Sequence, residues 1–141
     1  MERVFLDANV LFSAACRPDS HLRALWESSD VGLVSSEYAV EEARRNIQLA
    51  KPGNADGLKA LTDRLAVIGG VGDADLPEGI QLHEKDRPIL AAAIEAGASH
   101  LLTGDKTHFG HLFGKTVSGV LVLPPGEYLR GRQPRSEALD E

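Results

Sequence analysis

The sequence predicts an α/β fold with a mainly parallel sheet that helices cover on both faces. Residues 4–6 form a short run of β-branched, aromatic and aliphatic side chains, which is typical of a strand buried on both faces. Similar apolar runs recur at 31–34, 100–103 and 117–123, and stretches with helical periodicity separate them. Short apolar strands that alternate with helices indicate βαβ units, and such units build a parallel sheet.

The length and composition favour one soluble domain. The chain has 141 residues, and we expect a folded domain over 1–130 and a flexible tail over 131–141, where apolar residues are scarce. No apolar run approaches the roughly 20 residues needed to span a bilayer. Asp7 and Asn9 interrupt the first apolar run, so we predict no secretion signal. A cytoplasmic protein without a membrane contact is the expectation.

The charge and the cysteine count exclude some classes of site. Cys16 is the single cysteine, so neither an intrachain disulfide nor a cysteine zinc site can form. The net charge of −6 disfavours a broad electrostatic contact with nucleic acid. It is nevertheless compatible with an enzyme that gathers carboxylates around a metal while local basic residues contact phosphates.

In the first half of the chain, the strand at 4–6 is followed by a predicted helix over 9–15. Ser20 can cap a second helical piece over 21–28, in which Leu22, Leu25 and Trp26 share one face. A strand is expected at 31–34, and the next predicted elements are a long helix at 37–50, a helix at 54–65 and a short strand at 66–68.

In the second half, residues 69–79 are rich in Gly and Asp and are predicted to form a loop. Pro88 belongs in a first helical turn, so we predict a helix over 84–96 that ends at Gly97. The remaining predictions are a strand at 100–103, a loop through 109, a strand over 117–123 and a short closing element at 127–129.

Asp7 and Asp105 occupy equivalent places in this scheme. Each follows a buried strand, and ligands bind at the carboxyl ends of strands in open α/β sheets. The alternative for Asp7 is a helix cap, because Asp favours that position. The repetition of the pattern at Asp105 favours a functional site.

Two further acids are predicted to face the sheet. In the helix at 37–50, Glu42 lies at the edge of the apolar stripe, whereas Glu41 points away from it. Asp86 precedes Ile89 and Leu90 by three and four residues, so it projects from the face that packs on the sheet. Capping remains the alternative for Asp86.

We expect Asp7, Glu42, Asp86 and Asp105 to converge. Clustered carboxylates repel one another unless a cation neutralises them, and oxygen ligands suit Mg²⁺ or Mn²⁺. Such a site hydrolyses phosphodiester bonds, because the metal lowers the pKa of a bound water and stabilises the reacting oxygens.

Four ordered motifs resemble those of PIN-domain nucleases. They are Phe5-Leu6-Asp7-Ala8-Asn9, the Glu42 helix, Asp86-Arg87-Pro88-Ile89-Leu90 and Leu102-Thr103-Gly104-Asp105. The resemblance implies a three-layer α/β/α sandwich and Mg²⁺- or Mn²⁺-dependent endoribonuclease activity on single-stranded RNA. Small bacterial members are similar to the toxins of VapBC toxin–antitoxin pairs, which implies a cognate antitoxin partner and a homodimer.

The resemblance also implies roles for single residues. Asp7, Glu42, Asp86 and Asp105 match the metal-binding acids, and Asn9 and Thr103 match polar positions that support the metal or its waters. Many members carry a further acid two or three residues after the position of Asp105, where this chain has Thr107 and His108. We therefore expect one firmly held ion and a second that arrives with RNA. The candidate substrate contacts are Arg45, Lys106 and His108.

Other interpretations have less support from the residues. The spacing of His108 and His111 permits a transition-metal site, but no cysteine or nearby third ligand accompanies them, so surface or structural histidines are favoured. The Asp7-x-Asn9 pattern is similar to the Asp-x-Asp of haloacid dehalogenase phosphatases, but the second Asp is missing. No nucleotide-binding glycine motif is present. The remaining alternative is a catalytically degenerate module that binds RNA or protein without cleavage.

Overall fold

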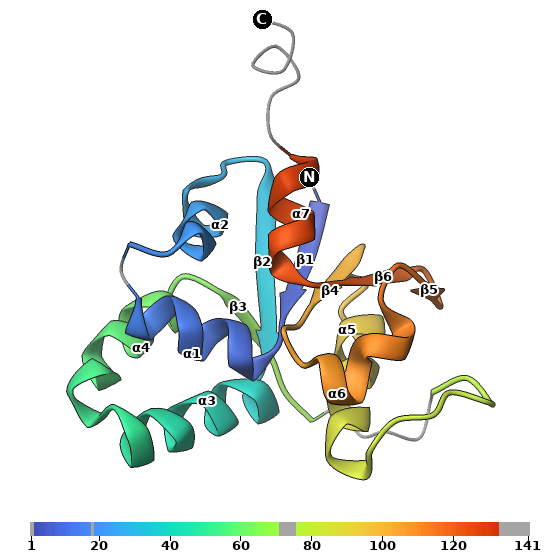
Figure 1. The fold of residues 1–141 in the computed structure, drawn as a ribbon, viewed down its shortest axis with the longest axis horizontal. Helices are drawn as coiled ribbons and strands as arrows, with labels where there is room; N and C mark the ends of the chain where they lie inside the picture. The colour runs from blue at the N-terminus through green and yellow to red at the C-terminus, as the bar shows by residue number, and fades with distance from the viewer. Residues whose placement is uncertain (1, 18, 71–75, 133–141) are drawn as a thin grey trace, which may run out of the picture.

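A computed structural model describes residues 2–17, 19–70 and 76–132. These residues form a sheet with the strand order β3-β2-β1-β4-β6-β5 (Figure 1). Neighbouring strands are parallel throughout, except that β5 is antiparallel to β6. The predicted α/β class with a mainly parallel sheet is confirmed.

The strands coincide with the apolar runs of the sequence. Val4, Phe5 and Leu6 are fully buried, as are Leu101 and Leu102, because β1 and β4 lie in the centre of the sheet. The bounds are β1 (Glu2–Leu6), β2 (Val31–Ser36), β3 (Ala66–Ile68), β4 (His100–Leu102), β5 (Thr116–Val117) and β6 (Val120–Leu123).

Some helices and 3₁₀ turns begin at a residue whose side chain caps them. Ser36 Oγ accepts a hydrogen bond from the Ala39 amide at 3.1 Å, and Ser20 Oγ accepts one from the Leu22 amide at 3.1 Å. The α-helices are α1 (Ala8–Cys16), α2 (Ala24–Glu27), α3 (Glu37–Ala50), α4 (Ala55–Thr62), α5 (Arg87–Glu95), α6 (Lys106–Phe109) and α7 (Pro125–Gly131). The 3₁₀ turns are η1 (His21–Arg23), η2 (Pro52–Asn54), η3 (Glu84–Asp86) and η4 (Gly110–Leu112).

Helices cover both faces of the sheet, as the sequence predicts. The chain passes from β1 through β2 to β3 and then returns to β4 on the other side of β1. Right-handed crossovers in opposite directions place their helices on opposite faces. In Figure 1, α7 passes in front of β1 and β2, and α5 lies behind β4. Within the described residues, we find no helix with the length and apolar character of a membrane span.

Two predicted elements differ in the structure. Residues 117–123 do not form one strand, because Ser118 (φ 48°) and Gly119 (φ 87°) turn the chain between β5 and β6. Residues 106–109 form the helical turn α6 instead of a loop, because Asp105 Oδ1 accepts a hydrogen bond from the His108 amide at 3.0 Å.

The C-terminal helix is attached to the start of β1. The Tyr128 hydroxyl donates to Glu2, and the guanidinium of Arg132 donates to Asp30 at 2.6 Å and to Glu2 at 3.3 Å. Gly131 and Arg132 thus belong to the ordered end of α7. The rest of the predicted tail, 133–141, lies outside the described residues, so the domain boundary at residue 130 stays a prediction.

Candidate metal centre

The candidate site lies where the strand order reverses. Successive connections lead from β1 to β2 on one side, and the later strand β4 pairs with β1 on the other side. At such a switch point, the segments that follow the two central strands diverge and leave a crevice at their carboxyl ends. Asp7 directly follows β1, and Asp105 follows β4, so both acids lie at this crevice. It is at the lower edge of the sheet in Figure 1.

Asp7 combines a cap with a buried charge. Its Oδ1 accepts a hydrogen bond from the Ala8 amide at 2.6 Å, and its Oδ2 accepts one from the Thr103 hydroxyl at 2.8 Å. Burial, together with the smaller effect of the charges of Glu42 and Asp86, raises the pKa of Asp7 to about 6 against these two hydrogen bonds. Asp7 therefore caps α1, as the alternative interpretation predicts. Its ionised form is also destabilised by burial and by the neighbouring acids.

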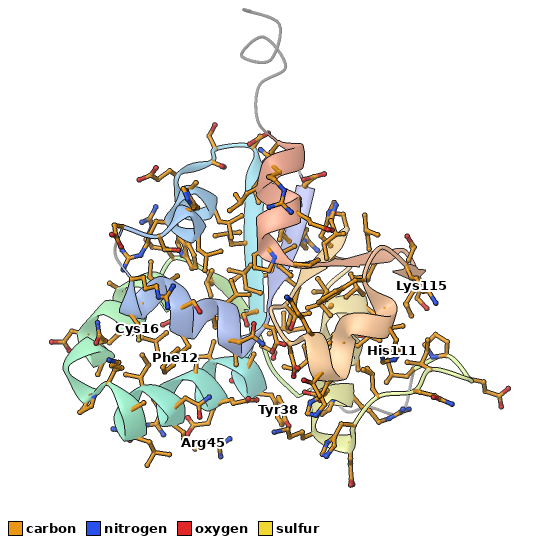
Figure 2. The ribbon with its side chains drawn as sticks, viewed as in Figure 1. Phe12, Cys16, Tyr38, Arg45, His111 and Lys115 are labelled. Atoms are coloured by element: carbon orange, nitrogen blue, oxygen red, sulfur yellow. The ribbon has the colours of Figure 1, made fainter. Side chains whose placement is uncertain are left out.

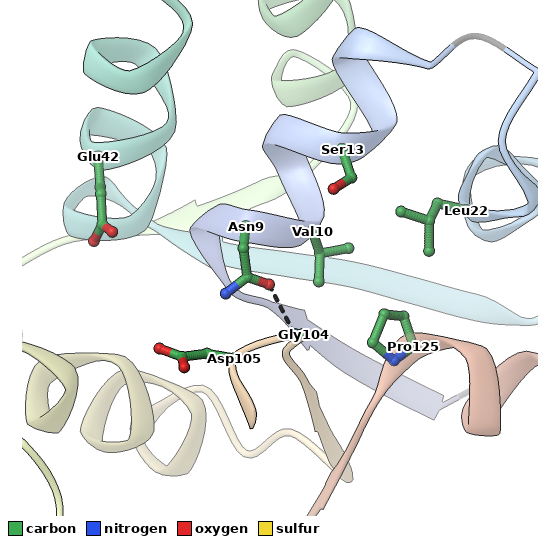
Figure 3. Close-up of a pocket in the computed structure, with 8 residues that line it drawn as sticks. All are labelled: Asn9, Val10, Ser13, Leu22, Glu42, Gly104, Asp105 and Pro125. Carbon is green, nitrogen blue, oxygen red and sulfur yellow. Dashed lines mark hydrogen bonds between the residues drawn. The ribbon is translucent and has the colours of Figure 1, made fainter. Parts of the chain in front are cut away.

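Thr103 and Asn9 join the ends of β1 and β4. The Thr103 hydroxyl is fully buried; besides donating to Asp7, it accepts from the Asp105 amide at 3.2 Å. The Asn9 amide donates to Asp7 at 3.2 Å, and its Oδ1 accepts from the Gly104 amide at 2.8 Å (Figure 3). Both residues thus hold the acids in position, whereas the predicted support of a metal or its waters by Asn9 and Thr103 stays a prediction.

Asp86 is buried without serving as a helix cap. It ends η3 and is 8% exposed, yet within the described residues its carboxylate accepts no capping hydrogen bond from α5. Burial is the largest cause that raises the pKa of Asp86, and the charge of Asp105 adds to it, while His108 opposes it. Tyr38, at the start of α3, donates its hydroxyl to the Lys85 carbonyl at 2.6 Å and so ties η3 to the site edge (Figure 2).

Asp86, Asp105 and His108 converge on one point. His108 Nδ1 lies 2.7 Å from Asp86 Oδ2 and 3.1 Å from Asp105 Oδ2, and one donor atom from each residue falls within 4.8 Å of the others. His108 is the third residue after the cap Asp105, and side chains at that position reach back toward the cap. Thr107, which with His108 occupies the positions where the resembled nucleases carry a further acid, is exposed.

His83 is a part of the site that sequence reasoning missed. Its ring stacks on that of His108 with centroids 5.1 Å apart and an interplanar angle of 19°. Its Nδ1 accepts from the Lys85 amide at 3.2 Å. The only available signal was its spacing of three residues before Asp86, which is too common to indicate a site. His111 instead places Nε2 2.6 Å from the Gln81 carbonyl oxygen, so His108 and His111 do not share a site.

Glu42 lies on the flank of α3 and faces the same crevice. It is half-buried, whereas Glu41 is exposed and pairs with Arg44, so the predicted orientations of these two acids agree with the structure. Glu42 and Asp105 lie at one end of a cleft of about 400 Å³ (Figure 3). Its lining residues are Asn9, Val10, Ser13, Leu22, Glu42, Gly104, Asp105 and Pro125.

The predicted basic contacts lie outside this cleft. Arg45 is exposed on α3 (Figure 2), and Lys106 is exposed at the start of α6. Neither is among the described residues that line the cleft. A contact between either side chain and a substrate phosphate stays a prediction.

A comparison with protein families identifies the fold family. A model described as PIN domain matches residues 3–107, which is most of the described chain and includes all four predicted acids. The chain belongs to the PIN domain family. The family resemblance inferred from the ordered acidic motifs is thereby confirmed.

Solved structures share this PIN fold at low sequence identity. DNA-bound VapBC from Salmonella typhimurium is 17% identical with a TM-score of 0.65, over 89% of this chain and 99% of that chain. VapBC2 from Rickettsia felis, bound to a promoter DNA fragment, is 19% identical with a TM-score of 0.63, over 86% and 98%. Mycobacterium tuberculosis VapC20, described as a toxin that cleaves the sarcin–ricin loop, is 18% identical with a TM-score of 0.53, over 72% and 91%.

These structural matches establish the fold. Among curated proteins, no relative matches the chain.

The donors of this PIN domain fit a divalent cation. Asp86 Oδ2 and His108 Nδ1 are buried, and neither finds a hydrogen-bond partner in the part of the chain that the structure describes. Buried polar atoms without partners are costly, and a shared cation would satisfy both of them. Carboxylate and imidazole donors bind divalent metals, so the residues at this edge are suited to hold one.

Proposed function

We propose that the chain is a divalent-metal-dependent endoribonuclease that hydrolyses single-stranded RNA, and that it is the toxin of a type II toxin–antitoxin pair. The observation that carries this proposal is the convergence of Asp86 and Asp105 beside the buried Asp7, at the switch point of a parallel sheet. A structural role does not require several carboxylates to be gathered at a cost in pKa, whereas a metal-assisted hydrolase does.

The four acids divide into two groups by their surroundings. Asp86 and Asp105 each place a carboxylate oxygen close to His108 Nδ1 and would hold the ion directly. Asp7 is fixed by Thr103 and by the Ala8 amide, so its carboxylate is presented in one orientation. Glu42 faces the crevice from α3 and completes the acidic rim. Mg²⁺ or Mn²⁺ bound here supplies a water of lowered pKa and neutralises charge on the scissile phosphate.

The cleft beside the acids is the place we assign to RNA. Its walls carry an amide from Asn9, a hydroxyl from Ser13 and apolar surface from Leu22 and Pro125 (Figure 3). A groove with both polar and apolar groups can bind an unpaired nucleotide, whose base presents hydrogen-bonding edges and an apolar face. Arg45 and Lys106 would contact the phosphates that extend beyond it.

The comparisons support a partner for this enzyme. VapBC from Salmonella typhimurium and FitAB, whose structure was solved with a DNA fragment, have the same fold as this chain. By analogy with the paired names of these proteins, we propose a cognate antitoxin. We also propose a homodimeric toxin, which the family resemblance implies. With an RNA substrate, we propose a cytoplasmic location.

The test is cleavage of a single-stranded RNA by the purified protein. We expect cleavage in Mn²⁺ or Mg²⁺ and its loss on addition of EDTA. Asp7→Asn, Asp86→Asn and Asp105→Asn should each lower the rate at least about 100-fold, because each removes charge from the metal site. Asp63→Asn is the matched control, since Asp63 pairs with Lys59 on the exposed surface of α4 and should leave the rate unchanged.

Two results would contradict the proposal in different ways. Activity at the wild-type level in Asp7→Asn would show that cleavage does not need the Asp7 carboxylate. RNA binding without cleavage in Mn²⁺ would favour the catalytically degenerate binding module. The toxin assignment is tested by expression in a bacterial host, where growth should stop and co-expression of the antitoxin should restore it.

A further inference from the structure

We infer that His108 is a direct metal ligand through Nδ1, and that it makes the site selective for Mn²⁺ or a later transition ion over Mg²⁺. The inference rests on the proposed metal-dependent function and adds the identity of one ligand and the preference for the ion. It concerns the place where this chain departs from the acidic pattern of its family.

The distances between the donor atoms fit common coordination. His108 Nδ1 lies 2.7 Å from Asp86 Oδ2 and 3.1 Å from Asp105 Oδ2. Neighbouring ligands of an octahedral ion with bonds of ~2.1 Å are about 3 Å apart. His108 Nδ1 therefore has the spacing of an adjacent coordination position from each of the two carboxylate oxygens.

A simple ion pair explains the arrangement less well. A protonated imidazole would aim its N–H at a carboxylate, yet His108 Nδ1 and Asp86 Oδ2 remain without a hydrogen bond within the described residues. Asp86 is 8% exposed, so water has little access to that oxygen. Two buried atoms that approach closely without a hydrogen bond are best satisfied by a cation between them.

The surroundings hold the His108 ring in place. Asp105 Oδ1 accepts from the His108 amide at 3.0 Å, which leaves Asp105 Oδ2 free to face the ring nitrogen. His83 stacks on the His108 ring with an interplanar angle of 19°. The ligand geometry is thus set before any ion binds, so little rotamer freedom is lost on binding.

The donor type decides the preference among ions. Mg²⁺ is a hard ion that takes oxygen ligands and retains waters, whereas a site that includes an imidazole nitrogen binds the divalent transition ions with an affinity that rises from Mn²⁺ through Co²⁺ along the first row. Replacing an acid of the family pattern by His108 removes one negative charge and adds one nitrogen. Both changes lower the affinity for Mg²⁺ relative to the transition ions.

The experiment is pulsed electron paramagnetic resonance on the full chain, stripped of metal and loaded with substoichiometric Mn²⁺. We expect modulation from a directly bound ¹⁴N nucleus in the wild type and its loss in both His108→Ala and His108→Gln. His21→Gln is the matched control, because His21 is exposed on η1 and should leave the signal unchanged. Calorimetry should show Mn²⁺ affinity at least about tenfold weaker in His108→Gln. The affinity for Mg²⁺ should change much less.

Three outcomes overturn the inference. They are the absence of ¹⁴N modulation in Mn²⁺-loaded wild type, its persistence in both His108 variants, and an equal loss of Mg²⁺ and Mn²⁺ affinity in His108→Gln. A signal that disappears in His83→Gln and not in the His108 variants would assign the ligand to His83. EDTA-sensitive RNA cleavage without ¹⁴N modulation would support the nuclease proposal and contradict the role of His108 as a ligand. ¹⁴N modulation without RNA cleavage would support His108 as a ligand and contradict the nuclease proposal.

Discussion

At the scale of single residues, the folded protein holds the Asp7 carboxylate in surroundings that disfavour its negative charge. This carboxylate is buried beside Glu42 and Asp86, and its pKa is raised to about 6 despite two hydrogen bonds. Because the folded protein binds a proton more tightly than the unfolded chain, the stability of the metal-free protein falls as the pH rises from about 4 through 6. A bound cation would remove this cost.

We predict that Asp7→Asn stabilises the metal-free protein at pH 8. The raised pKa of Asp7 lowers the free energy of unfolding at pH 8 by about 3 kcal/mol at most. Because Asn has one acceptor oxygen where Asp has two, the substitution also weakens a hydrogen bond, so we expect a net gain of about 1–3 kcal/mol. The gain should vanish near pH 4, where Asp7 itself is protonated. Urea unfolding in EDTA at pH 4, 6 and 8 measures this, with the exposed Asp63→Asn as the control. A variant less stable than the wild type at pH 8 would contradict it.

At the scale of elements, the turn between β5 and β6 shows how local backbone chemistry shapes the sheet edge. The mostly apolar stretch over 117–123 suggests one strand, but Ser118 and Gly119 both adopt positive φ and fold it into a hairpin. The sign of this turn in the sequence is the dipeptide Ser118-Gly119. A glycine inside a strand pattern often marks such a break.

We expect Gly119→Ala to destabilise the fold by about 1–2 kcal/mol, because an alanine is strained at φ 87°. The matched control is Gly53→Ala, since a methyl group there meets only open space and the backbone is outside the left-handed region. Its stability should equal or slightly exceed that of the wild type. Thermal unfolding of both variants checks this, and equal midpoints would mean that the hairpin turn tolerates a side chain.

At the scale of the whole molecule, the site is assembled from four segments far apart in the sequence. Asp7 follows β1, Glu42 lies on α3, Asp86 ends η3 and Asp105 precedes α6. A ligand that contacts several of these segments binds only the folded chain. Metal binding should therefore stabilise the fold as a whole.

We predict that Mn²⁺ at a hundredfold excess over its Kd stabilises the protein by about 2.7 kcal/mol. For a domain of this size, that corresponds to a rise in Tm of about 5–10 °C. The double variant Asp86→Asn/Asp105→Asn should lose most of the rise, because two ligands are gone. Differential scanning calorimetry with and without Mn²⁺ measures both proteins, and an equal rise in the double variant would place the ion elsewhere.

The sequence by itself determined the fold class, the buried strands and the placement of the acids on their elements. These features depend on local patterns: apolar runs mark β1 and β4, and the projection of the helix correctly separated Glu42 from the exposed Glu41. The ordered motifs also identified the PIN family, which the family model confirms. The metal-binding roles of the four acids remain proposals.

Only the tertiary structure decided how the acids are arranged and what joins them. The contact between Asp86 and His108 joins η3 to α6, and the stacking of His83 on His108 joins the same two segments. A sequence pattern records periodicity along one element, whereas these distances depend on how strands and helices pack against one another. For this reason His108, which the sequence left as a candidate substrate contact, becomes a candidate ligand in the folded chain.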